Sequence, residues 1–399
     1  MKEVIFLMST IRWSPVSAII DKNNNMAPGT IVCGSPGSGK TFFMLNVAAN
    51  CLGVGQNIVA IDPKNDFEKL YNVNHNVKVI NISNAKPGAM NPFTFLKEYD
   101  DHGNVIHKLD TNTLMTIVEQ LCGKLDKKEI IAVTPIITDF ITKSERHQDQ
   151  YVDMQDVADY LCKNKSEEAR AIGMQLNSYA DSEHGKLLFT REKAVKPLEF
   201  NANDSMIISL HGMQLPDYNK KVENYDANDK LTATLIYLIT TKLLHILSKK
   251  KRIPTTLFCD EAHLLFVNPT MASLIDRFLV LGRSLNNAVV LASQGISHFP
   301  EGIANYMTSR FLFKSSIDEA EKFLRLFDLS KVDPSQAIAF NSVLGMVSQF
   351  PRGYCYFIDR FNRNGVIEIK SIYDPSLLTS NPILQQEVVI KDNEDIKEE

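Results

Sequence analysis

One short segment constrains the fold of this 399-residue chain more than any other. Residues 34–41 read Gly34, Ser35, Pro36, Gly37, Ser38, Gly39, Lys40 and Thr41, which is a complete G-x-x-x-x-G-K-T pattern. Its glycines let backbone N–H groups approach phosphates closely, and a helix that begins directly after the loop presents the positive end of its dipole to them. An apolar run at Thr30–Cys33 and a helical pattern at Thr41–Leu52 provide that context. The segment therefore predicts a nucleotide-binding loop between a strand and a helix.

Two side chains of this loop have predicted roles. Lys40 is expected to reach the β- and γ-phosphates of ATP, and the Thr41 hydroxyl is expected to ligate Mg²⁺. The alternative is a glycine-rich turn that matches the pattern by chance, and the strand before the loop and the helix after it argue against this.

Short apolar runs recur along the chain and alternate with helical patterns. This rhythm is typical of a parallel sheet with crossover helices, so the expected fold class is α/β with a mainly parallel sheet. The expected strands are Thr30–Cys33, Asn57–Ile61, Val77–Ile82, Met206–Leu210, Thr255–Cys259, Ala288–Ala292, Arg310–Phe313, Tyr354–Ile358 and Val366–Lys370.

Residues 97–200 interrupt this rhythm. Apolar residues there fall at helical spacing, and Pro135 is expected to kink or split one of the helices. We expect an all-helical insertion at 97–200 between the two parts of the core, 1–96 and 201–386. The tail at 387–399 is acidic and is expected to be disordered.

A second chemical signal lies at the end of the run Thr255–Cys259. Asp260 and Glu261 follow it directly, so both carboxylates should lie at the carboxyl edge of the sheet, where folds of this class bind their ligand. Asp260 suits the magnesium shell, and Glu261 suits a residue that orients the attacking water or accepts its proton. An acidic helix cap is the alternative. Together with His263 these residues spell D-E-A-H, but no other helicase motif accompanies them.

Three further residues are candidates for the same chemistry. Gln294 comes at the end of the apolar strand expected at Ala288–Ala292. It would sense the γ-phosphate if that strand were a parallel neighbour of the strand that ends before Asp260. Arg283 begins the turn before the same strand, at the edge of the sheet opposite to this subunit's own phosphate site. An arginine there could act on the nucleotide of a neighbouring subunit as an arginine finger. A surface arginine is the alternative. Asp62 ends another strand and could orient water, or it could simply organise a turn.

Composition limits the remaining possibilities. With 43 Lys and Arg against 47 Asp and Glu, the formal net charge is −4, so the chain is not basic throughout and any contact with nucleic acid requires a local patch or a ring of subunits. The six cysteines form no C-x-x-C pair, which argues against a zinc site or a disulfide framework.

The apolar stretch Leu231–Leu247 contains Lys242 and His245, so a buried helix is expected rather than a membrane span. The basic run at 249–252 is expected to be solvated, with a DNA or membrane-surface contact as the alternative.

Taken together, these motifs resemble the large ATPase of conjugative type IV secretion systems, the VirB-four and TraC/TraE-like family within the HerA/FtsK superfamily. The matching segments are Gly34–Thr41, Asp62-Pro63 with Phe67, Asn91-Pro92-Phe93, Asp260-Glu261-Ala262, Gly282-Arg283 with Ser293-Gln294, and Arg352–Ile358. The resemblance implies a RecA-like P-loop NTPase core and fits an all-alpha subdomain at 97–200. Family members usually carry a long domain ahead of the loop, whereas 33 residues precede Gly34 here. We therefore expect either the motor portion alone or the product of a split gene.

The resemblance also implies a function. The chain is expected to hydrolyse ATP with Mg²⁺ and to use the energy to drive DNA or protein transfer. It is expected to form a homo-oligomer, a hexamer, in which Arg283 of one subunit acts on the nucleotide of the next. It is expected to work with other secretion components in the cytoplasm, at the cytoplasmic face of the membrane. One alternative is a HerA/FtsK-type DNA translocase that pumps duplex DNA directly. Another, of a different class, is a non-catalytic nucleotide-binding scaffold of the secretion machine.

Overall fold

A computed structural model describes most of the chain. The described residues are 29–99, 105–146, 151–190, 195–217, 220–248, 253–266, 269–282, 287–327, 334–359, 361–371 and 373–379. Arg283, the basic run 249–252 and the acidic tail 387–399 lie outside them.

The described residues form a nine-stranded sheet with the order β11-β10-β9-β1-β8-β7-β2-β6-β3. The strands are β1 (Gly29–Cys33), β2 (Asn57–Asp62), β3 (Lys78–Asn81), β6 (Met206–Ser209), β7 (Thr255–Cys259), β8 (Asn287–Ser293), β9 (Met307–Phe313), β10 (Tyr354–Ile358) and β11 (Asn364–Glu368). Only the pairs that involve β10 are antiparallel. The nine expected strands and the mainly parallel α/β sheet are therefore confirmed.

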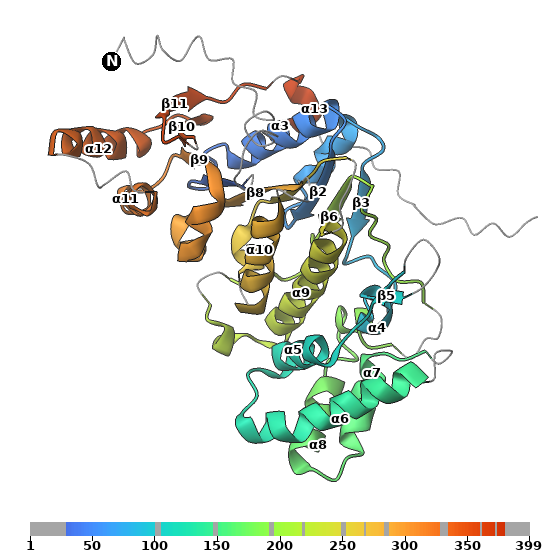
Figure 1. Cartoon of the computed structure of the whole chain (residues 1–399). Helices are drawn as coiled ribbons and strands as arrows, with labels where there is room; N and C mark the ends of the chain where they lie inside the picture. The colour runs from blue at the N-terminus through green and yellow to red at the C-terminus, as the bar shows by residue number, and fades with distance from the viewer. Residues whose placement is uncertain are drawn as a thin grey trace, which may run out of the picture.

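Helices cover both faces of the sheet (Figure 1). Helix α3 (Lys40–Gly53), η1 (Phe67–Asn72) and α13 (Pro375–Thr379) lie on one face, and α9 (Ala227–Leu247) and α10 (Pro269–Gly282) lie on the other. Successive residues of β1 point to opposite faces, so Val32 packs with the α3 layer while Ile31 and Cys33 pack with the α9 layer. The inner strands β1, β2, β6, β7, β8 and β9 are buried on both faces, which is why they read as continuous apolar runs, whereas β3 and β11 at the ends of the sheet are partly exposed.

Several short elements connect or extend these layers. They are α4 (Pro92–Phe95), η3 (Val222–Asn224), η4 (Ala262–Leu265), η5 (Ile296–His298), η6 (Glu301–Tyr306), α11 (Ile317–Leu326) and α12 (Pro334–Val347).

The segment 97–200 gathers at one end of the molecule, below α9 in Figure 1. It contains α5 (Thr111–Cys122), α6 (Lys127–Arg146), α7 (Met154–Cys162), α8 (Glu167–Asn177) and η2 (Gly185–Leu187). The apolar residues at helical spacing in α5 and α7 are buried, as expected. The expectation of an all-helical segment was wrong, because it also holds a short antiparallel pair, β4 (Glu98–Tyr99) with β5 (Val105–His107). Of the two expectations for Pro135, a split is wrong, since α6 continues through this residue, and a kink stays a prediction.

Helix α9 joins this segment to the core. By length and composition alone it is the one helix in the described ranges that could cross a membrane, but 78% of its apolar window is buried. It packs against α5, α10 and η4, so the prediction of a buried core helix is confirmed. All six cysteines are described and are free thiols.

Candidate nucleotide site

The loop that connects β1 to α3 is held in place from two sides. Ser35 N–H donates to the carbonyl oxygen of Lys314 at 2.7 Å, directly after β9, and the Ser38 carbonyl accepts from Gly353 N–H at 3.0 Å, directly before β10. Gly37 and Gly39 adopt positive φ values of 74° and 109°, which favour glycine. The sequence therefore folds here into a tight loop whose shape neighbouring strands support.

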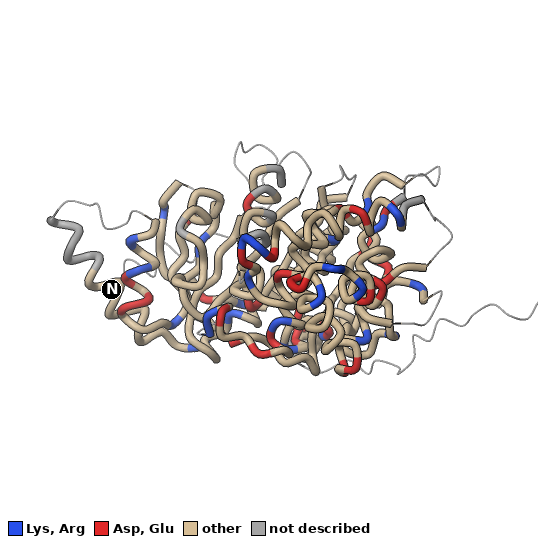
Figure 2. The backbone as a smooth tube through the Cα atoms, turned by 90° about the horizontal axis from the view of Figure 1, so that it is seen from below, with Lys and Arg blue, Asp and Glu red and all other residues tan. Residues whose placement is uncertain are grey.

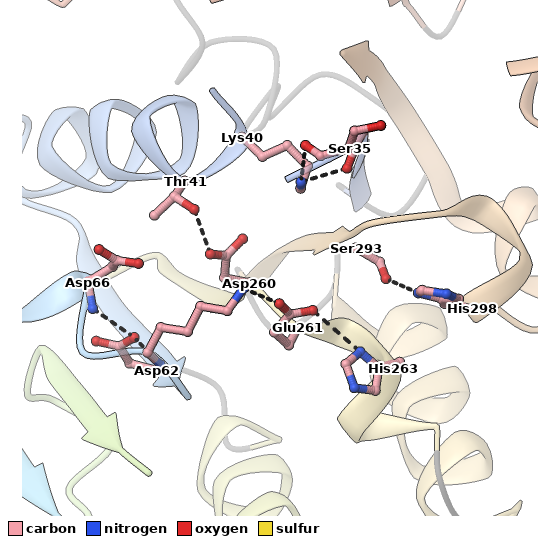
Figure 3. Close-up of polar contacts among 12 residues, drawn as sticks. Ser35, Lys40, Thr41, Asp62, Asp66, Asp260, Glu261, His263, Ser293 and His298 are labelled. Carbon is pink, nitrogen blue, oxygen red and sulfur yellow. Dashed lines mark hydrogen bonds and ion pairs between the residues drawn. The ribbon is translucent and has the colours of Figure 1, made fainter. Parts of the chain in front are cut away.

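Lys40 reaches back across this loop. Its Nζ donates to the carbonyl oxygen of Gly34 at 2.6 Å and to that of Ser35 at 3.1 Å (Figure 3). Burial lowers the pKa of Lys40, and the positive charge of Lys64 lowers it further, while the carboxylates of Asp260 and Glu261 act in the opposite direction. The ammonium group thus lies over the loop, where it can meet phosphate oxygens.

A hydrogen bond links the loop to the acidic strand end. The Thr41 hydroxyl donates to Asp260 Oδ2 at 2.7 Å, although 219 positions separate the two residues in the chain. Asp260 is 4% exposed, and burial raises its pKa while the Thr41 bond lowers it. A hydroxyl and a carboxylate are the hard oxygen ligands that Mg²⁺ prefers, so this pair fits the cation that an ATP site requires. Bound there, the cation would neutralise phosphate charge.

Glu261 lies beside Asp260, and both of its carboxylate oxygens contact nitrogen atoms. Lys64 Nζ forms an ion pair with Oε1, and His263 Nδ1 lies 3.4 Å from Oε2 (Figure 3). Burial raises the pKa of Glu261, but the contacts with His263 and Lys64 outweigh this and hold that pKa at about 2. The carboxylate is therefore ionised and oriented near the loop.

Strand β8 lies between β1 and β7. Cys33 pairs with Ser293, and Cys259 pairs with Leu291, so Gln294 follows β8 at the sheet edge where Gly34 and Asp260 also emerge. The expectation that the Gln294 strand is a parallel neighbour of the Asp260 strand is confirmed. The role of Gln294 as a γ-phosphate sensor stays a prediction, as does the role of Arg283 in trans.

Asp62 has a clear structural task. The residue is 1% exposed, and its carboxylate accepts hydrogen bonds from the backbone N–H groups of Lys64, Asp66 and Phe67 at 3.3, 3.1 and 2.8 Å. Burial raises its pKa to about 6 despite these bonds. Of the two interpretations left open by the sequence, the contacts favour the turn organiser.

Sequence reasoning missed Lys64. It lies in the turn after β2, and β2 pairs directly with β7, so the turn and Glu261 meet at the same edge of the sheet. The available signal was a lysine directly after the Asp62-Pro63 strand end, next to an expected phosphate site. It was overlooked because a lysine in a polar turn is normally solvated.

Comparisons with solved structures agree with this architecture. VirB4 of Thermoanaerobacter pseudethanolicus matches with a TM-score of 0.67 and 16% sequence identity, over 88% of this chain and 91% of that one. The bacterial conjugative coupling protein TrwB, in an unbound form, matches with a TM-score of 0.51 and 13% identity, over 86% and 84% of the two chains. These likenesses confirm the RecA-like P-loop NTPase fold. No curated protein sequence matches the chain.

A family model covers almost the same extent of the sequence. The model described as "AAA-like domain" matches residues 16–380, which include the loop at 34–41, both carboxylates after β7, Gln294 and the segment 97–200. The chain therefore belongs to the AAA-like domain family, and its fold is that of P-loop NTPases.

Proposed function

We propose that the chain is an ATP-hydrolysing motor that drives the transfer of DNA or protein through a conjugative type IV secretion system. The observation that carries the enzymatic part is the Thr41–Asp260 hydrogen bond, because it brings the loop hydroxyl and the acidic strand end together as a magnesium-dependent ATP site needs. The secretion part is supported by the motif resemblance and by the VirB4 and TrwB folds.

The described residues divide the chemistry among them. Lys40 and backbone N–H groups of the loop Gly34–Thr41 would bind the phosphates, except at Ser35, whose N–H donates to Lys314, and at Pro36, which has none. Thr41 with Asp260 would hold Mg²⁺. Glu261 would orient the attacking water and accept its proton, and Gln294 would contact the γ-phosphate. These residues follow the ends of the adjacent strands β1, β8 and β7, and Lys40 and Thr41 begin the helix α3 after the β1 loop, so neighbouring strand ends assemble the site.

Two substitutions test the enzymatic part. Glu261→Gln should retain binding of magnesium-ATP and lose turnover by ~10²-fold or more, the usual scale for a positioned general base. Lys40→Ala should instead weaken binding, because Lys40 contacts the phosphates of the ground state. Hydrolysis at the wild-type rate in Glu261→Gln would show that another group handles the water. A wild-type chain that binds ATP without turning it over would favour the non-catalytic scaffold.

We propose an oligomer, of hexamer type, in which Arg283 serves a neighbouring subunit. An arginine finger is worth ~10³–10⁵ in turnover, so Arg283→Ala should bind ATP and hydrolyse it very slowly. Mixing inactive Arg283→Ala with inactive Lys40→Ala should restore activity, because each Lys40→Ala subunit can lend its arginine to a neighbour with an intact loop. Subunits that exchange and remain inactive would contradict a shared site.

The DNA translocase is the rival within the same superfamily. Basic and acidic residues are interspersed along the described backbone in Figure 2, and the formal net charge of the chain is −4. Strong stimulation of ATP turnover by duplex DNA, falling steeply with salt, would favour the translocase. Weak or salt-insensitive stimulation would favour a motor that acts through its partners.

A further inference from the structure

Lys64 and Glu261 form an ion pair that the proposed hydrolysis has to break or rearrange. In the structure the ammonium group of Lys64 contacts Oε1 of Glu261. A carboxylate that orients the attacking water needs an oxygen directed at that water. The Oε2 side faces His263 at 3.4 Å, and the His263 side chain is 14% exposed, so that side is closed by the protein. Oε1 is therefore the oxygen available to water, and Lys64 covers it.

Lys64 is free to leave this position without disturbing the core. Its side chain is 52% exposed, whereas the Glu261 side chain is 7% exposed. The backbone that carries Lys64 is fixed, because Asp62 accepts three backbone N–H groups of this turn and Asn65 adopts a left-handed φ of 63°. Any movement is thus confined to the long, flexible lysine side chain.

A released Lys64 has one obvious new partner. Glu261 is the immediate neighbour of Asp260, and Asp260 bonds to Thr41 at the loop, so the Lys64 ammonium lies on the side of the site that faces Lys40 and Thr41. Lys64 follows β2, which pairs with β7, so its ammonium group contacts the residue directly after Asp260, the partner of Thr41. In agreement with this placement, the positive charge of Lys64 lowers the pKa of Lys40. A triphosphate held by Lys40 would carry one more anionic group than a diphosphate, and this γ-phosphate is the group expected beside Asp260, Glu261 and the attacking water.

We propose that Lys64 is a second phosphate-binding lysine, which pairs with Glu261 in the nucleotide-free chain and transfers to the γ-phosphate of a bound nucleoside triphosphate. The transfer uncovers Oε1 of Glu261 only when a triphosphate is present. Glu261 can therefore orient the attacking water when a triphosphate is bound, and cannot do so when the site is empty or holds a diphosphate. The inference rests on the proposed function, since it needs Glu261 and the loop in the roles given above.

Binding measurements on a double-mutant cycle test this directly. The variants are Lys64→Met, Glu261→Gln and the double variant, and the probes are ADP and the non-hydrolysable analogue AMPPNP, each with Mg²⁺, titrated by calorimetry. Lys64→Met should lose about tenfold or more in affinity for AMPPNP, the scale of a hydrogen bond to a charged group, and change little toward ADP. Glu261→Gln should bind AMPPNP more tightly than wild type, because Lys64 no longer has to leave a carboxylate. That gain should vanish in the double variant.

Lys78→Met is the matched control. Like Lys64, Lys78 is an exposed lysine in an ion pair, here with Asp204, and it lies in β3 at the far edge of the sheet. It should alter neither affinity. Lys64→Arg keeps the charge and should retain most of the preference for AMPPNP over ADP.

Two results would overturn the proposal. One is a Lys64→Met chain with the wild-type preference for AMPPNP over ADP. The other is a Glu261→Gln gain that persists in the double variant, which would mean that the loss of a negative charge near the phosphates is the whole effect. Failure of the proposed function looks different: wild type would not bind nucleotide, or Glu261→Gln would hydrolyse ATP normally.

Discussion

Replacing Gly39 by alanine tests whether the nucleotide-binding loop at 34–41 depends on its close contact with Gly353, the residue directly before β10. Gly39 has φ 109°, and a Cβ there would lie 3.1 Å from the nitrogen and 3.3 Å from the Cα of Gly353. That backbone cannot move freely, because Gly353 N–H donates to Ser38 and the Gly353 carbonyl accepts from Ile369 at 2.8 Å. Gly39→Ala must therefore both adopt a left-handed conformation and displace a hydrogen-bonded neighbour.

The magnitude follows from these two costs. A left-handed conformation costs an L-residue about 1–2 kcal/mol, and a weakened hydrogen bond adds about 0.5–1.5 kcal/mol. The free energy of unfolding should thus fall by roughly 1.5–3.5 kcal/mol in Gly39→Ala. Gly55 is the matched control: it follows the same helix with φ 75°, and a Cβ there has no atom within 4 Å. Gly55→Ala should lose only the conformational part, about 1–2 kcal/mol.

Urea denaturation and nucleotide titration together give the readout. Because Gly39 directly precedes Lys40 and the start of α3, Gly39→Ala should also weaken ATP binding, by about tenfold or more if one charged contact is lost. Gly55→Ala should bind ATP like wild type. Equal losses of stability in the two variants, with equal affinities for ATP, would show that the close approach to Gly353 has no energetic importance.

Three further outcomes are expected. Chelation of Mg²⁺ with EDTA should abolish turnover and excess Mg²⁺ should restore it, as a colorimetric phosphate assay would show. Phe43→Ala should cost about 3–5 kcal/mol in urea denaturation, because this buried ring packs between Phe311 and Phe313 at centroid distances of 4.4 and 5.9 Å and its loss leaves a cavity. Burial raises the pKa of Asp153 from 3.8 to about 6, so the folded chain binds this proton more tightly than the unfolded chain does. Wild type should therefore gain stability relative to Asp153→Asn, by up to about 2 kcal/mol, as pH falls from 6 toward 4 in parallel urea titrations.

The sequence predicted the strands well because most of them are short apolar runs bounded by turn residues and buried on both faces. β7 was expected at Thr255–Cys259 and is observed there, and β10 likewise at Tyr354–Ile358. Periodicity predicts which residues are apolar together, but not which strands are neighbours. β6 follows the segment 97–200 and nevertheless pairs between β2 and β3, which only the packed structure reveals. The two-residue strand β4 was missed because a pair this short has no periodic pattern.

The same limit explains why one half of the candidate site was predictable and the other half was not. Lys40, Thr41 and Asp260 belong to patterns in which spacing itself implies chemistry, and the structure brings Thr41 and Asp260 within hydrogen-bonding distance. Lys64 belongs to no such pattern, and it lies 197 positions from Glu261 in the chain. Their contact depends on β2 and β7 being adjacent, so that two strand ends present opposite charges to each other. A charged side chain in a turn therefore has a predictable function only after the order of the strands is known.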